Sequence, residues 1–549
     1  MHRDDNMVDL LRIIKYYKAP LLIGFSQWLI TMFLQVDRAF FDYDYPTEYY
    51  WIVKACYLIA LLVIWSFIFF VYKKIKNGDK FYSRLWQVMR VYLFVEMLLL
   101  LILWPGTWSW DDLLTLKVIS WYSDFDAWQH VLTGIYQAVL LQILPFPGGI
   151  IILQSIIIAL CVGYFMARIE TSYEIVRLKN KYLDILLKII PFLLPPVLMY
   201  QFSGYRMGLY IYLELVTLIM IICGIKDKQE WKWNKIWILS FLVIVISVWR
   251  TESFVYIPCI GILICAQDKK VLSKTKKLLF ILTVILGFAG LTNYQNYELG
   301  NSNYQIISLM RPEAEIVRIA DDVEDAKELK ALDKVTDLQV IYDNPDLNGE
   351  ELFWNTGCVR NRNEDPYDDF SQNNYKKYLR ALIKLSLKYP KVVLEERWNL
   401  FLIGSGVTGE TFENVDRSAD LFEPDNGNVA IDMALASGWR AITPLFRNLR
   451  REFIILLGGH GVEIYRKIVW NAIIPILVLI YAWVKSLVGK KWSLWMLISA
   501  VVVRVPIVFI TEPSGWIMYL LSFYFLGYVY LVYILWINYS KKKGAIKYE

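Results

Sequence analysis

Apolar runs close to the length of a membrane-spanning helix recur along the chain, and they constrain its fold more than any other feature. A soluble protein of 549 residues must cover itself with polar surface, yet 57% of these residues are hydrophobic and the mean hydropathy is +0.39. The chain is therefore predicted to be an all-α polytopic membrane protein. The runs lie near residues 20–36, 51–73, 88–105, 131–146, 149–168, 185–200, 208–224, 236–249, 254–267, 278–292, 467–485, 493–511 and 516–538.

Clusters of Lys and Arg between these runs predict the topology, because such clusters are concentrated in cytoplasmic loops. They fall on one side of the membrane only if the run 131–146 does not cross. That run is short, holds Gln137 and Gln142, and ends in the sequence PFPG. It is predicted to be a helix at the outer interface. The other runs give about 12 transmembrane helices with both termini in the cytoplasm. The clusters lie at 11–18, 73–80, 177–181, 226–235, 269–277, 485–491 and 541–547.

This topology divides the chain into five segments. The long polar segment 293–466 shows helical periodicity, for example over Tyr375–Leu402, so it is predicted to be a mainly helical extracytoplasmic domain inserted before the last three spans. The segments are 1–105 with spans 1 to 3, 106–148 with the outer loop and interfacial helix, 149–292 with spans 4 to 9, 293–466, and 467–549 with spans 10 to 12 and a cytoplasmic tail.

Several classes of function are disfavoured by composition and motifs. The net charge of +6 comes from short loop clusters and not from a basic face, which argues against nucleic-acid binding. Five of the six cysteines lie in apolar runs, so no disulfide framework is predicted. Three histidines argue against a His-rich zinc site. No phosphate-binding loop, no GxGxxG after a strand and no HExxH motif occurs.

Two adjacent carboxylates follow the third predicted span, in the outer stretch "WPGTWSWDDLL" at 104–114. One interpretation is that Asp111 or Asp112 caps a helix beginning at Leu113. The other is that the pair acts on a substrate hydroxyl as a general base. A divalent cation such as Mg²⁺ or Mn²⁺ is compatible with Asp111 and Asp112 as ligands but is not required.

Other polar residues are predicted on the same outer side. Gln129 and His130 precede the interfacial helix, and Arg206 ends the short turn 201–206. His130 is either a substrate contact or a hydrogen-bonded helix residue.

A second group combines arginines with a carboxylate. Arg250 and Glu252 form the next outer turn, and Arg311 follows the ninth span. Arg250 and Glu252 form either a structural ion pair or part of a phosphate site, since a guanidinium binds phosphate oxygens bidentately.

Charged residues also lie within the apolar runs. Glu96, Glu214 and Arg504, the last near Glu512 in sequence, are functional candidates because charge is costly in a bilayer.

The layout and one loop resemble the GT-C superfamily of polytopic glycosyltransferases, which use polyprenyl-phosphate sugars as donors. The loop "WPGTWSWDDLLTL" is similar to the PG-x-x-x-x-D pattern of bacterial members that serve cell-surface polysaccharides. The stretch "DAWQHVLTGIYQ" resembles their H-P helix opening, with Val131 in place of proline, and Arg250 and Glu252 resemble a luminal R-x-E/D turn. Two additional spans precede the loop, and the soluble portion precedes the last three spans instead of following them.

The resemblance implies a membrane glycosyltransferase in the bacterial plasma membrane. It would move a sugar from a polyprenyl-phosphate donor to an extracytoplasmic glycan or glycolipid acceptor, with Asp111 as general base, Asp112 as its neighbour and arginines on the phosphate. No cofactor is required in this scheme. A polysaccharide polymerase and a lipid-linked oligosaccharide flippase or transporter are the alternatives, the latter favoured by broken helices and paired charges at the midplane.

Overall fold

The computed structural model describes residues 18–32, 48–119, 125, 129–299, 306–360, 372–411, 445–459 and 462–545. The elements in these ranges are helical, apart from a single bridge between Thr336 and Val359. An all-α fold is thus confirmed for the described part of the chain. Residues 18–32 are helical. The elements up to the soluble body are α2 (Glu48–Lys76), α3 (Lys80–Leu103), α4 (Trp110–Lys117), α5 (Val131–Ile143), α6 (Pro147–Tyr173), α7 (Lys181–Lys188), η3 (Ile190–Leu193), α8 (Pro195–Gln201), α9 (Arg206–Asp227), α10 (Trp233–Trp249), η4 (Thr251–Val255), α11 (Tyr256–Cys265) and α12 (Lys274–Leu299).

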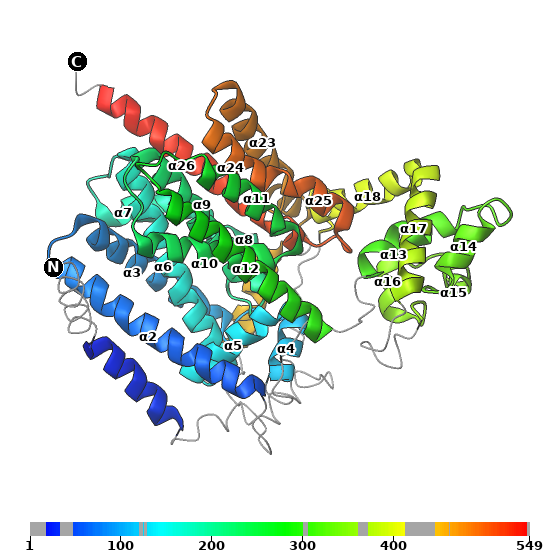
Figure 1. Ribbon diagram of the computed structural model, residues 1–549, viewed down its shortest axis with the longest axis horizontal. Coiled ribbons are helices and arrows are strands. Elements are labelled where there is room, and N and C mark those ends of the chain that lie inside the picture. Colours follow the sequence, from blue (N-terminus) through cyan, green and yellow to red (C-terminus); the bar gives the residue numbers. More distant parts are fainter. Residues whose placement is uncertain are drawn as a thin grey trace.

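The remaining elements form a helical body and then return to the bundle (Figure 1). They are α13 (Ile307–Val317), α14 (Ala326–Leu332), α15 (Leu338–Asp343), α16 (Gly349–Asn355), α17 (Gln372–Lys388), α18 (Pro390–Gly404), α21 (Arg447–Gly458), α22 (Glu463–Val469), α23 (Ile473–Val488), α24 (Trp492–Val502), α25 (Arg504–Thr511), η7 (Ile517–Tyr519) and α26 (Leu521–Ala545).

Eight helices in the described ranges are long and apolar enough to cross a membrane, so the chain is a helical multi-pass membrane protein. The predicted run 185–200 is not one helix. Pro191, Pro195 and Pro196 break it into α7, η3 and α8, because proline lacks the N–H that continues a helix. The runs 236–249 and 254–267 become the shorter helices α10 and α11. The total of about 12 spans stays a prediction.

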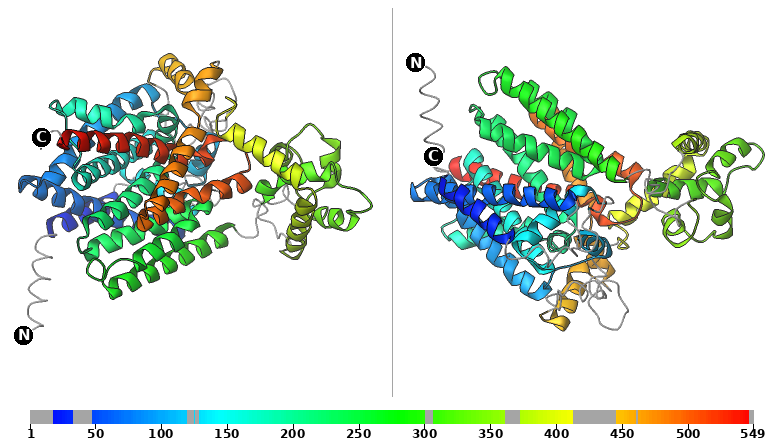
Figure 2. Two further views of the ribbon diagram at one scale, coloured as in Figure 1. Left: turned by 90° about the horizontal axis from the view of Figure 1, so that it is seen from above. Right: turned by 60° about the horizontal axis from the view of Figure 1, so that its bottom comes forward.

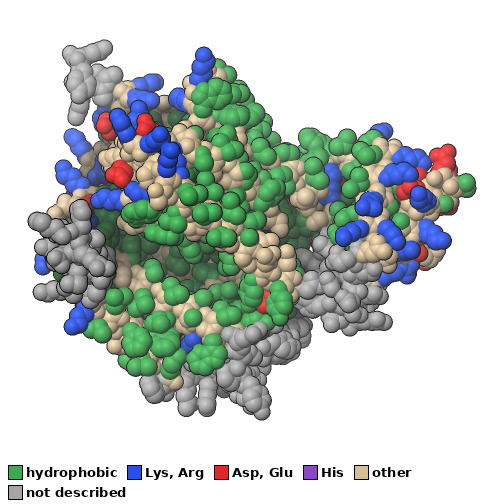
Figure 3. Space-filling model, viewed as in Figure 1, with side chains coloured by type: hydrophobic (Ala, Val, Ile, Leu, Met, Phe, Trp, Pro, Cys, Tyr) green, Lys and Arg blue, Asp and Glu red, His purple; other side chains and the backbone are tan. Residues whose placement is uncertain are grey.

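The bundle has two ends of different character. At the basic end, which carries the last turns of α2, α9, α23 and α26, Lys276 Nζ donates to Trp231 O at 2.8 Å and Val176 N donates to Ser540 Oγ at 2.9 Å. Figure 3 shows Lys and Arg gathered at this end, with hydrophobic side chains along the flank. At the opposite end, here called the loop end, Thr107 N donates to Phe202 O at 2.9 Å.

The helix α5 stays at the loop end. Its first residue, Val131, donates to Gln295 Oε1 at 2.7 Å, near the end of α12. Near its last turn, Gln142 Oε1 accepts from Lys54 Nζ at 2.9 Å, close to the start of α2. With 13 residues the helix is about 20 Å long, too short to reach the basic end.

The elements α13 to α17 form a body that projects beyond the loop end, with α18 running back to the bundle (Figures 1 and 2). This body has its own hydrophobic core, which includes Met310, Leu332, Phe353 and Tyr378. α18 packs against α25, and α21 packs against α3 and α8. Within the segment 293–466, α12 continues to Leu299, and α22 leads directly into α23.

The centre and edges of the bundle differ in burial. In α9, 78% of the most apolar stretch is buried inside the protein, whereas only 17% of the corresponding stretch is buried in α2 and in α12. α2 and α12 therefore lie at the edge, where they are exposed to lipid. Figure 3 shows the face between them hollowed and covered with hydrophobic side chains. They approach each other at the loop end, where Tyr49 OH donates to Glu298 Oε2 at 3.1 Å.

Candidate functional site

The loop between α3 and α4 is held against the turn between α8 and α9. Gly106 has φ of 120°, and a Cβ there would lie 2.6 Å from Phe202 O, so only glycine fits. Thr107 Oγ1 donates to Met199 O at 2.6 Å. Trp108 is fully buried, and its indole N–H donates to Pro105 O at 3.1 Å. The tertiary contacts thus place Trp108 in the core and not in an interfacial belt.

The two carboxylates of this loop lie in different environments. The helix α4 begins at Trp110, three residues before the predicted start, and Ser109 is its N-cap. Asp112 is fully buried, and its Oδ2 accepts from Ser203 Oγ at 2.6 Å and from Ser109 N at 3.3 Å. Asp112 therefore stabilises the first turn of α4 from inside the helix, as its third residue. The prediction that Asp111 or Asp112 is the N-cap of a helix beginning at Leu113 is wrong, because Ser109 takes that position. Asp111 is partly buried.

Burial raises the pKa of Asp112 to about 8, and the charge of Asp111 adds to the effect. At neutral pH, Asp112 is protonated, so the pair carries at most one negative charge. Since Oδ2 already accepts two hydrogen bonds, the proton belongs on Oδ1, which has no partner among the described residues. The site thus holds a neutral carboxylic acid beside a second carboxyl group.

The start of α5 meets the same region. Arg206 Nη1 donates to Gln129 O, and the side-chain amide of Gln129 is buried without a partner in the described ranges. Gln137 Nε2 donates to Gly204 O at 2.9 Å, in the turn that also carries Ser203. Gln129, His130 and Arg206 are therefore gathered at the α8–α9 turn, which also contacts the acidic loop through Ser203.

His130 is the N-cap of α5, with φ of 81°. Its Nδ1 accepts from Leu132 N at 3.2 Å, so a neutral imidazole carries its hydrogen on Nε2. Burial and the nearby charge of Arg206 lower the pKa of His130 to about 3. His130 is thus a neutral hydrogen-bond donor, and its capping bond matches the alternative of a hydrogen-bonded helix residue.

Arg250 and Glu252 form the ion pair considered from the sequence. Arg250 Nε donates to Glu252 Oε1 at 2.8 Å, and both side chains are buried. Arg250 Nη1 has no partner in the described part of the chain. The neighbouring Trp249 donates to Thr133 Oγ1 of α5 at 3.0 Å, which ties the pair to the acidic-loop region.

Arg504 joins this pair to a larger charge network. Its Nη2 lies 3.5 Å from Glu252 Oε1, and its Nη1 donates to Glu214. Glu214 also accepts from Ser522 and Tyr256. Glu512, its near neighbour in sequence, lies instead beside Arg397, which donates to the Glu512 carbonyl at 2.6 Å. Glu96 of α3, which is also fully buried, accepts from Gln201 Nε2 at 2.5 Å.

Arg311 lies away from the acidic loop, at the junction of α13 with the loop after α25. It donates to Pro513 O at 2.7 Å and to Glu350 Oε2 at 3.1 Å, and lies 3.7 Å from Glu396. These contacts engage its guanidinium at the junction, and none of them reaches Asp112 or Arg206.

Two residues of the site were missed from the sequence. Ser203 links Asp112 to the α8–α9 turn, and Arg450 of α21 donates to Gly106 O at 2.7 Å and to Leu103 O at 3.3 Å. Burial lowers the pKa of Arg450 to about 10. The signal for Arg450 was the basic stretch "RNLRR" on the predicted outer side, where Lys and Arg are scarce. A serine in a short turn offers no such signal.

Among the described residues, no group of three or more His, Cys, Asp and Glu side chains is placed to hold a metal ion. The arrangement supplies a carboxylate, a neutral acid, a neutral imidazole and guanidinium N–H groups. Comparisons with known protein families, with curated protein sequences and with solved structures find no match to this chain.

Proposed function

We propose that this chain is a membrane glycosyltransferase that moves a sugar from a polyprenyl-phosphate donor to an extracytoplasmic acceptor, a surface polysaccharide or glycolipid. The observation that carries the proposal is the convergence of three segments at the loop end. Asp111 and Asp112, the Gln129–His130 pair, and Arg206 come together there, opposite the basic end. Asp112 Oδ1, the side-chain amide of Gln129 and Arg206 Nε are buried without hydrogen-bond partners in the described ranges, so they are available to a substrate.

In the proposed reaction, Asp111 accepts the proton of an acceptor hydroxyl while the oxygen of that hydroxyl forms a bond to the anomeric carbon of the donor. The bond between that carbon and the phosphate oxygen breaks, and the polyprenyl phosphate leaves with the electron pair. Asp112, protonated at neutral pH, keeps the pair from repelling the donor phosphate with a second charge. The reaction requires no nucleotide, which agrees with the absence of phosphate-binding motifs in the sequence.

The leaving phosphate requires positive hydrogen-bond donors. Arg206 Nε and Arg250 Nη1 are buried guanidinium nitrogens without partners in the described residues, and the His130 imidazole retains Nε2–H. Arg311 is not included in this role because its guanidinium is engaged at the α13 junction. The hollowed, hydrophobic face between α2 and α12 supports access of a polyprenyl chain from the bilayer.

The proposal includes a topology. The loop end faces outward, the basic end and both termini lie in the cytoplasm, and α5 lies at the outer interface. The helix at residues 18–32, the broken segment 181–201 and the short helices α10 and α11 then cross together with the eight long helices, which gives 12 crossings. Support comes from the lysines at the basic end and from the two ends of α5, which both contact the loop end. A bacterial plasma membrane is the proposed location.

A flippase for lipid-linked saccharides is the second candidate. The broken segment of α7, η3 and α8 and the buried pair of Glu214 and Arg504 favour it, because transporters use broken helices and internal charge pairs.

Purified protein in liposomes separates the two candidates. Liposomes are loaded with polyprenyl-phosphate sugars and given a glycolipid acceptor, and both sugar transfer and lipid translocation are measured. The proposal expects transfer that Asp111→Asn abolishes. Translocation without transfer, abolished by Glu214→Gln, would establish the flippase instead. Asp227→Asn serves as a matched control, because Asp227 pairs with Arg168 at the basic end, far from the loop.

A further inference from the structure

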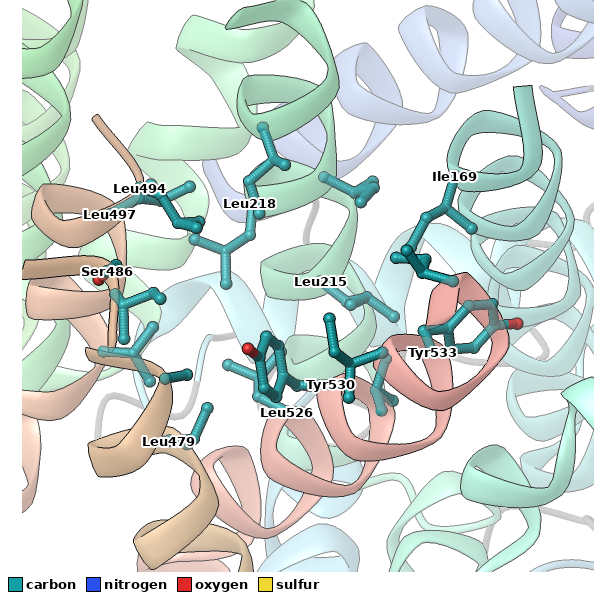
Figure 4. Close-up of a pocket in the computed structure, with 18 of the residues that line it drawn as sticks. Ile169, Leu215, Leu218, Leu479, Ser486, Leu494, Leu497, Leu526, Tyr530 and Tyr533 are labelled. Carbon is teal, nitrogen blue, oxygen red and sulfur yellow. The ribbon is translucent and has the colours of Figure 1, made fainter. Parts of the chain in front are cut away.

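An apolar pocket of about 290 Å³ lies among α6, α9, α23, α24 and α26, toward the basic end. Leu215 and Leu218 line it from α9, Leu497 from α24 and Leu526 from α26 (Figure 4). It is remote from the acidic loop, which lies at the other end of the same helices.

Two tyrosines of α26, Tyr530 and Tyr533, line this pocket with their aromatic rings. The ring of Tyr530 lies within it (Figure 4). Tyr533 contributes its ring, since its hydroxyl points away and donates to Lys188 O at 3.2 Å. The interior therefore suits a hydrocarbon chain.

Three lysines border the pocket, and no acidic residue lines it. Lys485 lies in the last turn of α23, Lys491 precedes α24, and Lys541 lies in the last turns of α26. All three are exposed, and none forms an ion pair with a carboxylate in the described part of the chain. Lys485 Nζ donates only to the Tyr481 hydroxyl, at 3.3 Å. The rim thus carries three positive charges that no carboxylate of the described residues neutralises.

The dimensions match one leaflet of a bilayer. Leu526 and Lys541 lie on one helix, about 22 Å apart along its axis at about 1.5 Å per residue. Half of the hydrocarbon core is about 15 Å thick, and a headgroup layer lies beyond it. An acyl chain placed beside Leu526 therefore brings its phosphate to the level of the lysines.

We propose that this pocket binds an anionic phospholipid, with an acyl chain between α9, α24 and α26 and the phosphate on Lys485, Lys491 and Lys541. Charge complementarity selects the anionic lipid, because a zwitterionic lipid brings its own ammonium group to a rim that is already positive. A second, shallower groove between α23 and α26 shares Lys485 and Tyr530 and extends the apolar surface. The site is independent of the proposed glycosyl transfer.

The test uses the full chain, delipidated in detergent and titrated with phosphatidylglycerol or with phosphatidylcholine of the same acyl chains. Native mass spectrometry counts the lipids retained, and thermal unfolding reports stabilisation. We expect phosphatidylglycerol to bind about tenfold or more tightly than phosphatidylcholine, since each lysine near the surface favours an anionic headgroup. Replacing Lys485, Lys491 and Lys541 with Gln together abolishes this preference.

The matched control replaces Lys269, Lys270 and Lys274 with Gln. These lysines are also exposed at the basic end, but Lys269 and Lys270 lie on the turn between α11 and α12 and Lys274 begins α12. The control keeps the preference for phosphatidylglycerol. Leu218→Trp, which fills the pocket, removes tight binding of both lipids. Because the three rim lysines are exposed, their replacement leaves the fold in place even if Leu218→Trp does not fold.

Three results would overturn the proposal. One is equal affinity of the wild-type protein for the two lipids. Another is a preference for phosphatidylglycerol that survives replacement of the rim lysines or is lost equally in the control. The third is a delipidated protein that forms a dimer in which neither lipid binds, since the pocket would then be covered by a second copy of the chain.

Discussion

The hydroxyl of Ser203 lies 2.6 Å from Asp112 Oδ2, and this hydrogen bond joins the turn between α8 and α9 to the first turn of α4. Tyr205 N donates to the same hydroxyl at 2.9 Å, so the Ser203 side chain is held both by its own turn and by Asp112. Asp112 therefore has a structural role, and Asp111 is left as the partly buried carboxylate of the pair. The predictions below separate these two roles.

Asp111→Asn is expected to abolish sugar transfer, because an amide cannot accept the hydroxyl proton. The apparent unfolding temperature should change little. Asp112→Asn should be milder, since the native Asp112 is protonated at neutral pH and Asn keeps an acceptor for Ser203. Asp112→Ala should cost about 1–3 kcal/mol, through loss of the cap and of the partner of Ser203. Wild-type turnover in membranes carrying Asp111→Asn would contradict the catalytic assignment.

The stability of the protein should depend on pH through Asp112. Its pKa rises from 3.8 to about 8 on folding, so between these values the folded chain binds a proton that the unfolded chain releases. The free energy of unfolding therefore falls as pH rises through this window, and this contribution levels off above about 8. Asp112→Asn removes the effect. Unfolding temperatures of both proteins from pH 6 to 9 should diverge, with the variant becoming relatively more stable toward alkaline pH.

Glu252 is shared by two arginines, whereas Arg250 contacts one carboxylate, and this makes the pair asymmetric. Glu252→Gln should lower the free energy of unfolding by about 3–5 kcal/mol, because it leaves two buried guanidinium groups with less compensating negative charge. Arg250→Gln should lower it less. The double variant should recover part of the loss, as judged by the unfolding temperature.

Activity of the double variant tests the second role of Arg250. If Arg250 Nη1 holds the donor phosphate, the double variant is folded but inactive, with weakened donor binding. Arg250→Lys should also be impaired, since a point charge lacks the bidentate fork. Full activity in the double variant would remove Arg250 from the site.

The proposed topology can be read with an impermeant thiol reagent added to intact cells. Cys265 is the exposed cysteine among the described residues, so it is first replaced by Ala. A cysteine at Asp346, exposed on the α13–α17 body, should then react from outside, and one at Asn234, exposed at the basic end, should react only after the membrane is opened. Labelling of position 234 in intact cells would reverse the topology or require that α5 crosses.

Local sequence determined the helical membrane class and much of the arrangement of the helices. Apolar length and Lys placement act within one segment, so they predicted the long spans, the single basic end and the short helix α5. The break at Pro191, Pro195 and Pro196 was also readable, because proline interrupts a helix wherever it folds. Hydropathy alone predicts one run at 185–200, because it carries no information about the missing N–H of proline.

Only the tertiary structure decided the partners of the polar residues. Arg504 lies within the apolar run 493–511 and close in sequence to Glu512, yet it pairs with Glu214 and Glu252, which lie on α9 and η4. Ser203 reaches Asp112 because the α8–α9 turn is packed on the loop around Gly106 and Trp108. A buried polar group must be paired, but which group it meets depends on how helices distant in sequence pack, and no local pattern encodes that. Composition and periodicity therefore define the helices, whereas packing selects which carboxyl group of the Asp111–Asp112 pair is fully buried and which is only partly buried.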